Sequence, residues 1–208
     1  MIERVKAKDG QTILKLNGRQ ICTSLNPLRE ARDWVKKNSR RFAEMKTVIV
    51  IGVGCGFHLA EIRRRFENTK IVALDFNQEL IDFSAETHGL DLVGAELIKV
   101  GSVTEVAKNS TIRAAIAGSY AVVRFMPCTN QQLEQYNELE CTMLGRNILG
   151  FKMVVGARAR MGEIFNPKVN MAAITSNPTV TIKSLFESLG PNETSESLMV
   201  RALRELVN

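Results

Sequence analysis

The chain has 208 residues, with 45% hydrophobic residues, 24% charged residues and a formal net charge of +6, which are ordinary values for a globular protein with one sizeable core. It contains no run of about 18 apolar residues and no apolar signal region after Met1, so we expect a cytoplasmic protein without a membrane span. Its four cysteines form no CxxC pair, and we therefore expect reduced thiols and no zinc site.

Three short β-strands are expected at the N-terminus, over residues 2–5, 12–16 and 19–22. Asp9-Gly10 and Asn17-Gly18 lie between them, and such pairs favour tight hairpins because both turn residues must adopt positive φ. We interpret these strands as a small β-meander.

A helix is expected after the meander. Asn26 is a suitable N-cap, and Pro27 suits the first helical position. The apolar residues that follow recur at helical spacing, namely Leu28, Ala31, Trp34 and Val35. Residues 1–45 are thus predicted to form hairpins and a helix that covers the first strand of a larger sheet.

Strand patterns alternate with helix patterns from residue 46 to residue 176. The expected strands cover residues 47–51, 70–74, 95–100, 120–125 and 151–155. The expected helices cover residues 58–66, 78–87, a short segment from 103, 111–117 and 131–144. This alternation favours a doubly wound, mostly parallel sheet with helices on both faces, which is a Rossmann-like α/β fold. Right-handed crossovers would place the carboxyl ends of these strands at one edge of the sheet.

The last segment, residues 177–208, has a different pattern. Asn177-Pro178 interrupts the chain, and residues 182–189 and 195–206 read as two short amphipathic helices. We therefore expect a short helical tail after the α/β core.

The most informative feature of the chain is a glycine-rich turn. The apolar stretch 48–51 leads into Gly52, Gly54 and Gly56, and a second apolar stretch ends in Asp75. Glycines allow backbone conformations that are closed to other residues, and they let a ligand approach the main chain. A carboxylate at the end of the second strand can accept hydrogen bonds from ribose hydroxyls. The pattern therefore indicates a nucleoside-type ligand at the edge of the sheet.

The turn differs from the dinucleotide fingerprint, because Phe57 stands where GxGxxG has its third glycine. It resembles motif I and its acidic partner in class I S-adenosylmethionine-dependent methyltransferases, over about residues 47–125. The resemblance implies S-adenosylmethionine as the cofactor, with its methionine part against the glycines and its ribose on Asp75. It also implies that the adenine lies beside Phe76, Gly101, Ser102 and Val103. The alternative is an α/β domain whose glycines serve only the packing of helix on strand.

The sequence assigns no catalytic residue and no methyl acceptor. His58 directly follows the turn, where a neutral imidazole could point into the ligand cleft or be hydrogen-bonded locally at the helix start. Cys55 is interpreted as a spacer within the turn. The segment 124–130 follows the fourth strand of the core, where many methyltransferases carry residues for the acceptor, but it lacks the Asp/Asn-Pro-Pro-Tyr pattern used for amino groups of bases.

A second resemblance covers about residues 6–83. The two hairpin pairs, the segment Thr23-Ser-Leu-Asn-Pro-Leu-Arg-Glu-Ala31 and the turn Gly52-Val-Gly-Cys-Gly-Phe-His-Leu59 occur in an order that is similar to the leading domain of the bacterial motility accessory factors. Those proteins are tied to flagellin glycosylation with nonulosonic acids. Their larger central domain is the part associated with transferase function. The resemblance therefore implies a non-catalytic or accessory Rossmann-like domain.

Basic residues gather within residues 36–41, 63–65 and 158–160. Such clusters occur both on nucleic-acid-binding surfaces and on solvated helix faces. Aromatic residues make up only 6% of the chain, and no aromatic pair lies among the basic residues to stack on bases. A solvated surface is therefore favoured, with a nucleic-acid partner as the alternative.

Overall fold

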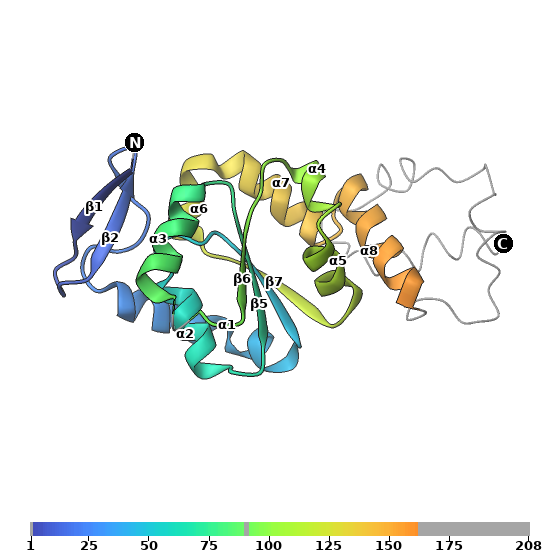
Figure 1. Cartoon of the computed structure of the whole chain (residues 1–208), viewed down its shortest axis with the longest axis horizontal. Coiled ribbons are helices and arrows are strands. Elements are labelled where there is room, and N and C mark those ends of the chain that lie inside the picture. Colours follow the sequence, from blue (N-terminus) through green and yellow to red (C-terminus); the bar gives the residue numbers. More distant parts are fainter. Residues whose placement is uncertain (1, 90–91, 162–208) are drawn as a thin grey trace.

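Four successive strands of the chain form a parallel sheet. The computed structural model describes residues 2–89 and 92–161, and its central strands are β4 (Thr47–Ile51), β5 (Lys70–Asp75), β6 (Ala95–Lys99) and β7 (Tyr120–Arg124) (Figure 1). They lie in the order β6-β5-β4-β7, so the first and fourth strands of the sheet are neighbours. This is the order 3-2-1-4 with which a Rossmann fold begins, and the predicted Rossmann-like α/β fold is confirmed at this level.

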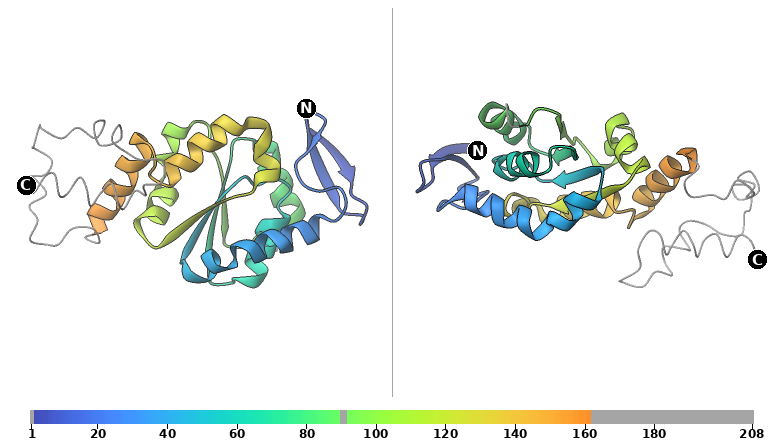
Figure 2. Two further views of the ribbon diagram at one scale, coloured as in Figure 1. Left: turned by 180° about the vertical axis from the view of Figure 1, so that it is seen from behind. Right: turned by 90° about the horizontal axis from the view of Figure 1, so that it is seen from below.

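The helices follow the strands in alternation. Their bounds are α1 (Pro27–Glu44), α2 (Phe57–Arg65), α3 (Gln78–His88), α4 (Val103–Val106), α5 (Ser110–Ala117), α6 (Met126–Thr129), the 3₁₀ helix η1 (Asn130–Gln132), α7 (Leu133–Met143) and α8 (Ile148–Met161). In Figure 1, α7 lies above the strands and α1 with α2 below them, and Figure 2 (left) shows the same arrangement from behind.

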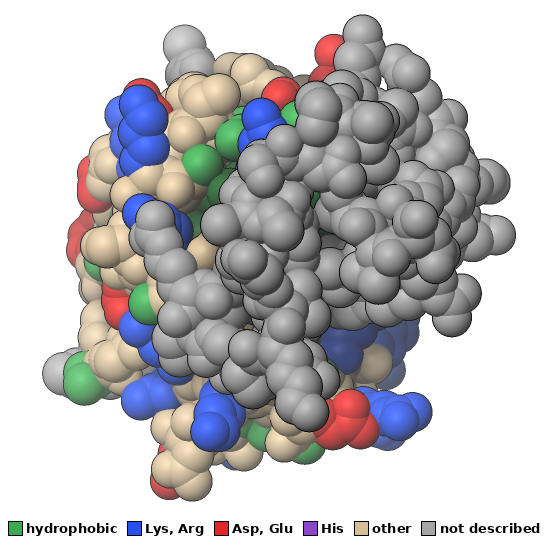
Figure 3. Space-filling view, turned by 90° about the vertical axis from the view of Figure 1, so that its right-hand side faces the viewer, with side chains coloured by type: hydrophobic (Ala, Val, Ile, Leu, Met, Phe, Trp, Pro, Cys, Tyr) green, Lys and Arg blue, Asp and Glu red, His purple; other side chains and the backbone are tan. Residues whose placement is uncertain are grey.

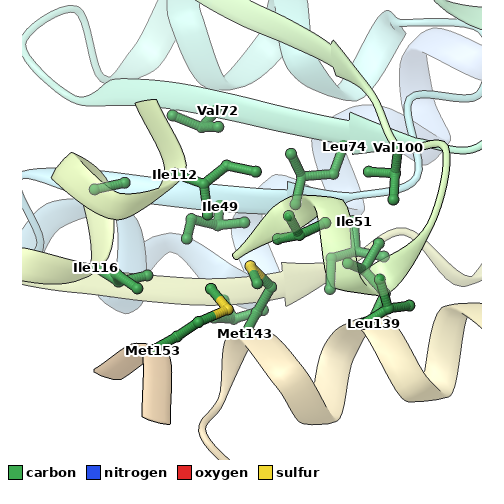
Figure 4. Packing of buried hydrophobic residues seen from close by; sticks show 14 of the residues in the cluster. Ile49, Ile51, Val72, Leu74, Val100, Ile112, Ile116, Leu139, Met143 and Met153 are labelled. Carbon is green, nitrogen blue, oxygen red and sulfur yellow. The ribbon is translucent and has the colours of Figure 1, made fainter. Parts of the chain in front are cut away.

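Both faces of the sheet are buried at its central strands β4 and β5, which explains why these two strands read as continuous apolar runs. One face packs against α5, α7 and α8 through the residues drawn in Figure 4, among them Ile49, Ile51, Val72, Leu74, Leu139, Met143 and Met153. The alternate residues of the same strands point the other way and pack against α1, α2 and α3 through Val48, Val50, Ile71, Ala73, Val35, Phe42, Leu59 and Ile81. Because successive side chains of a strand point to opposite faces of the sheet, each strand packs against both helical layers.

A second, smaller sheet lies at the N-terminal end (Figure 1). Its antiparallel strands are β1 (Ile2–Lys6), β2 (Thr12–Leu16) and β3 (Arg19–Gln20). The β2–β3 turn is the two-residue pair Asn17-Gly18, and both of its residues have positive φ, 52° and 76°. A longer connection, residues 7–11, joins β1 to β2.

The small sheet packs on the carboxyl edge of the large one. Ile13, Leu14 and Ile21 share a buried cluster with Cys55 and with residues of α1, α3 and α6. Helix α1 connects the two sheets, and its cap is as predicted: the Asn26 side chain accepts a hydrogen bond of 2.7 Å from the Arg29 N–H, with Pro27 as the first helical residue.

The predicted strand at residues 151–155 is wrong, because this segment lies within helix α8. Asn147 precedes the helix; its side chain accepts from the Gly150 N–H at 2.7 Å, and its carbonyl accepts from the Phe151 N–H at 2.8 Å. The buried residues Phe151, Met153, Val154 and Ala157 then recur at helical rather than alternating spacing. The apolar run is thus helical because α5 and α7 offer it a helix-packing surface.

The predicted helical tail, residues 177–208, lies outside the described residues. Among the helices that the structure describes, none has the length and apolar content needed to cross a bilayer.

Candidate functional site

The glycine turn connects β4 to α2 at the carboxyl edge of the sheet. Gly52, Gly54 and Gly56 have φ values of +94°, +52° and +82°, which side chains with a Cβ rarely adopt. Gly56 is the N-cap of α2. The sequence prediction of a tight strand–turn–helix connection is therefore confirmed in its backbone.

The chain itself occupies the space over this turn. A Cβ on Gly52 would lie 2.5 Å from Cys128 Sγ and 2.7 Å from Thr129 Cγ2, both on α6. A Cβ on Gly56 would lie 2.2 Å from Ser84 Oγ of α3. Because glycine has no side chain, helices α6 and α3 of this chain can pack directly against the turn. In a Rossmann domain the ligand binds at this place.

Asp75 ends β5 and is completely buried. Its Oδ2 accepts a hydrogen bond of 2.7 Å from the Val53 N–H, and its Oδ1 accepts from the Asn77 N–H at 3.0 Å and from Tyr136 Oη at 2.8 Å. Burial raises the pKa of Asp75, and the hydrogen bonds that the carboxylate accepts oppose this rise. Asp75 was predicted to bind a ribose, but both of its carboxylate oxygens already accept hydrogen bonds from within the protein.

Tyr136 reaches Asp75 from helix α7. Its side chain is 2% exposed, and burial raises the pKa of its hydroxyl far above the usual range, so the hydroxyl stays protonated and donates. Its ring meets the ring of Phe76 edge to face, with 5.1 Å between the centroids.

Arg124 lies over the ring of Tyr136, with its guanidinium carbon 5.8 Å from the ring centroid. Its Nε donates to Thr129 Oγ1 at 2.7 Å, and its Nη1 donates to Asn137 Oδ1 at 2.5 Å. This side chain is 5% exposed, and in the described part of the chain its Nη2 has no hydrogen-bond partner. Arg124 thereby ties β7 to α6 and α7 and holds the covering helices in place.

His58 lies beneath the turn and is 1% exposed. Its Nε2 is 3.0 Å from the Gly52 carbonyl oxygen, and its ring stacks on Phe125 with 3.9 Å between centroids and an interplanar angle of 6°. Trp34 meets the same ring edge on. Burial lowers the pKa of His58 to about 3, so the imidazole is neutral and its Nε2–H donates to the carbonyl. The local, structural alternative describes this position; the side chain does not face a cleft.

All four predicted adenine neighbours line one open groove. Its volume is about 290 Å³, and its walls come from the β5–α3 and β6–α4 connections and from α7. The lining residues are Phe76, Gly101, Ser102, Val103, Thr104, Gln135 and Glu138. The structure thus brings the predicted base-binding residues together, whereas α7 covers Asp75, and α6 and α3 cover the glycines.

Little in the sequence indicated that residues of α6 and α7 would cover Asp75 and the glycine turn. Tyr136, Leu139 and Met143 recur at helical spacing and read as an ordinary core face. Nothing in that spacing indicates that a hydroxyl would meet a carboxylate 61 residues away in the chain. Cys128 and Thr129 belong to the segment 124–130 that was singled out for an acceptor.

The remaining polar clusters give no metal site. Among residues 2–89 and 92–161, no group of three or more His, Cys, Asp or Glu side chains could hold a metal ion. Where described residues are visible in Figure 3, Lys and Arg side chains are scattered, with some Asp and Glu side chains among them.

Comparison of the chain with protein-family models, with curated proteins and with solved structures gives no match. Function is therefore inferred from the geometry of the site and from the two sequence resemblances.

Proposed function

We propose that this chain is a non-catalytic, accessory Rossmann-like domain whose nucleoside-binding edge is filled by its own helices. The carboxylate of Asp75 carries the proposal, because a ribose can bind it only after the hydroxyl of Tyr136 leaves. The resemblance to the leading domain of the motility accessory factors supports the same assignment. Such a domain would act through its contacts with partners in flagellin glycosylation, not through a reaction of its own.

The energetic cost of opening the site is large. Removing the hydrogen bond to a buried carboxylate and exposing part of the tyrosine ring costs about 4 kcal/mol. A ligand that had to supply this energy would bind about a thousandfold more weakly than it binds an open Rossmann site. A cofactor would then bind too weakly to support turnover at ordinary cellular concentrations.

Isothermal titration calorimetry with S-adenosylmethionine, S-adenosylhomocysteine and adenosine tests this proposal. We expect no binding by the folded wild-type chain at ligand concentrations of about 1 mM. Tyr136→Phe removes the hydrogen bond and keeps the ring, and Tyr136→Ala opens the space; weak binding by the alanine variant alone would support closure by α7. A wild-type dissociation constant below about 0.1 mM would refute it.

The second candidate is an S-adenosylmethionine-binding, methyltransferase-like protein with an unidentified acceptor. The open groove lined by Phe76 and Gly101 favours it, since an aromatic ring and a backbone without side chain suit the flat face of an adenine. Binding would require α7 to move so that Asp75 becomes accessible. If the wild-type chain binds S-adenosylhomocysteine, Phe76→Ala should weaken the binding, and Leu133→Ala, an exposed residue of α7 outside the groove, should not.

A further inference from the structure

A second cavity lies on the opposite helical layer, between α1, α2 and the end of α3. Its volume is about 600 Å³, which is within the usual range for small-molecule sites. It shares no lining residue with the groove of Phe76, and neither Asp75 nor Tyr136 lines it. Its ligand is therefore a question separate from the proposed function.

Three arginines line this cavity, Arg32 from α1 and Arg64 and Arg65 from α2. One carboxylate, that of Glu61, stands among them. Counting three positive charges against one negative charge leaves an excess of two positive charges. This balance favours an anion with two negative charges.

Glu61 holds two of the arginines in place. Its side chain is 10% exposed, and its oxygens accept two hydrogen bonds of 2.9 Å from Arg64 and form an ion pair with Arg65. The hydrogen bond from Arg64 lowers the pKa of Glu61, burial opposes that effect, and the charge of Arg65 adds to the lowering. The glutamate therefore stays ionised near neutral pH and fixes both guanidinium groups, so a bound anion has less side-chain motion to arrest.

Arg32 faces the cavity from the other helix. In the described part of the chain its side chain has no hydrogen bond or ion pair. A guanidinium group presents a planar set of donors that matches a phosphate with two parallel hydrogen bonds. Its donors are thus available to a ligand that α2 contacts from the opposite side.

The rest of the lining is apolar or aromatic. Leu28 and Ala31 of α1 and Phe57 and Ala60 of α2 contribute carbon surface. The ring of Phe57 meets the His88 ring edge to face, with 4.7 Å between centroids. A cavity with arginines and an apolar wall suits an anion that carries an organic body.

We propose that this cavity binds a phosphate monoester of a small organic molecule. Arg32, Arg64 and Arg65 hold the phosphate, and the apolar wall of α1 and α2 contacts the carbon part. No covalent step is involved, so the cavity acts as a recognition site on the accessory domain.

The test uses phenyl phosphate, inorganic phosphate and phenol, titrated into the full chain by calorimetry in about 150 mM salt, where distant surface charges are screened. We expect phenyl phosphate to bind with a dissociation constant below about 1 mM and at least about tenfold more tightly than the other two compounds. Arg32→Ala should weaken this binding by about tenfold or more. The variant should fold, since Arg32 is exposed.

Arg29→Ala is the matched control, because Arg29 lies one turn earlier on α1, is exposed and does not line the cavity. It should change the binding by less than about twofold. Ala60→Trp leaves every charge in place and should block the cavity. Absence of binding by the folded wild-type chain, or equal losses in Arg29→Ala and Arg32→Ala, would overturn the proposal. Neither result depends on whether the chain binds S-adenosylmethionine.

Discussion

Acidification is predicted to destabilise the fold through His58. Burial lowers its pKa to about 3 in the folded chain, whereas a histidine in an unfolded chain has a pKa of about 6.5. The unfolded state therefore binds a proton that the folded state rejects, and the free energy of unfolding falls as the pH falls through this interval. The difference of about 3.5 pKa units corresponds to about 5 kcal/mol. That loss is comparable to the whole stability of a typical domain, about 5–15 kcal/mol.

Urea unfolding at a series of pH values measures this effect. Trp34 is the only tryptophan and touches the His58 ring, with 5.2 Å between centroids, so its fluorescence reports on this region directly. In His58→Gln the amide can still donate to the Gly52 carbonyl but cannot take up a proton. We expect this variant to lose about 1–3 kcal/mol at neutral pH from the missing ring. As the pH falls, the free energy of unfolding of this variant should decrease less steeply than that of the wild-type chain. The two slopes should differ by up to about 1.4 kcal/mol per pH unit.

The control is His88→Gln, which changes the other histidine of the chain and should keep the steep dependence. An equally steep loss of stability in His58→Gln and in the wild-type chain would show that another group takes up the proton, and would refute this account of His58.

Two further predictions concern the turn and its cover. Gly52→Ala should cost about 3 kcal/mol or more, because φ is +94° and the new Cβ meets a cysteine sulfur at 2.5 Å; Gly10→Ala, with φ +86° and open space, should cost only about 1 kcal/mol. Similar urea midpoints for the two variants would contradict the close packing over the turn. Tyr136→Phe should cost about 1.5–3 kcal/mol, since Asp75 loses a buried donor. A loss of under about 0.5 kcal/mol in urea unfolding would mean that this hydrogen bond is not made in solution.

The fold of the core followed from local patterns in the sequence. The strands β4 and β5 are apolar from Val48 to Ile51 and from Ile71 to Leu74, where the two helical layers cover them, and the glycines mark where the chain must turn. Each of these features is encoded within about ten neighbouring residues, which is the range over which periodicity is informative. The prediction of a strand at residues 151–155 was wrong because a short, mostly apolar run of residues is compatible with both a buried strand and a buried helix.

Local sequence patterns could not predict whether this site is open or covered. The residue types of Gly52 and Asp75 and their places at strand ends are local features, and they predict a ligand site. Whether the site is open depends on Tyr136 and Cys128, which come from other elements and approach only in the folded chain. Their positions are set by helix packing, and the sequence spacing of those helices shows only an ordinary apolar face.

The order β6-β5-β4-β7 has a consequence for how the chain folds during synthesis. During synthesis β4 can pair with β5 as soon as both strands have left the ribosome, but the partner of its other edge, β7, begins only at Tyr120. Until then β4 presents the unpaired edge of a strand whose residues Val48–Ile51 are all completely buried in the finished protein. Such an edge is a template for wrong pairing with other chains. A nascent chain halted before β7 would therefore be prone to aggregate, although most of the sheet had already formed.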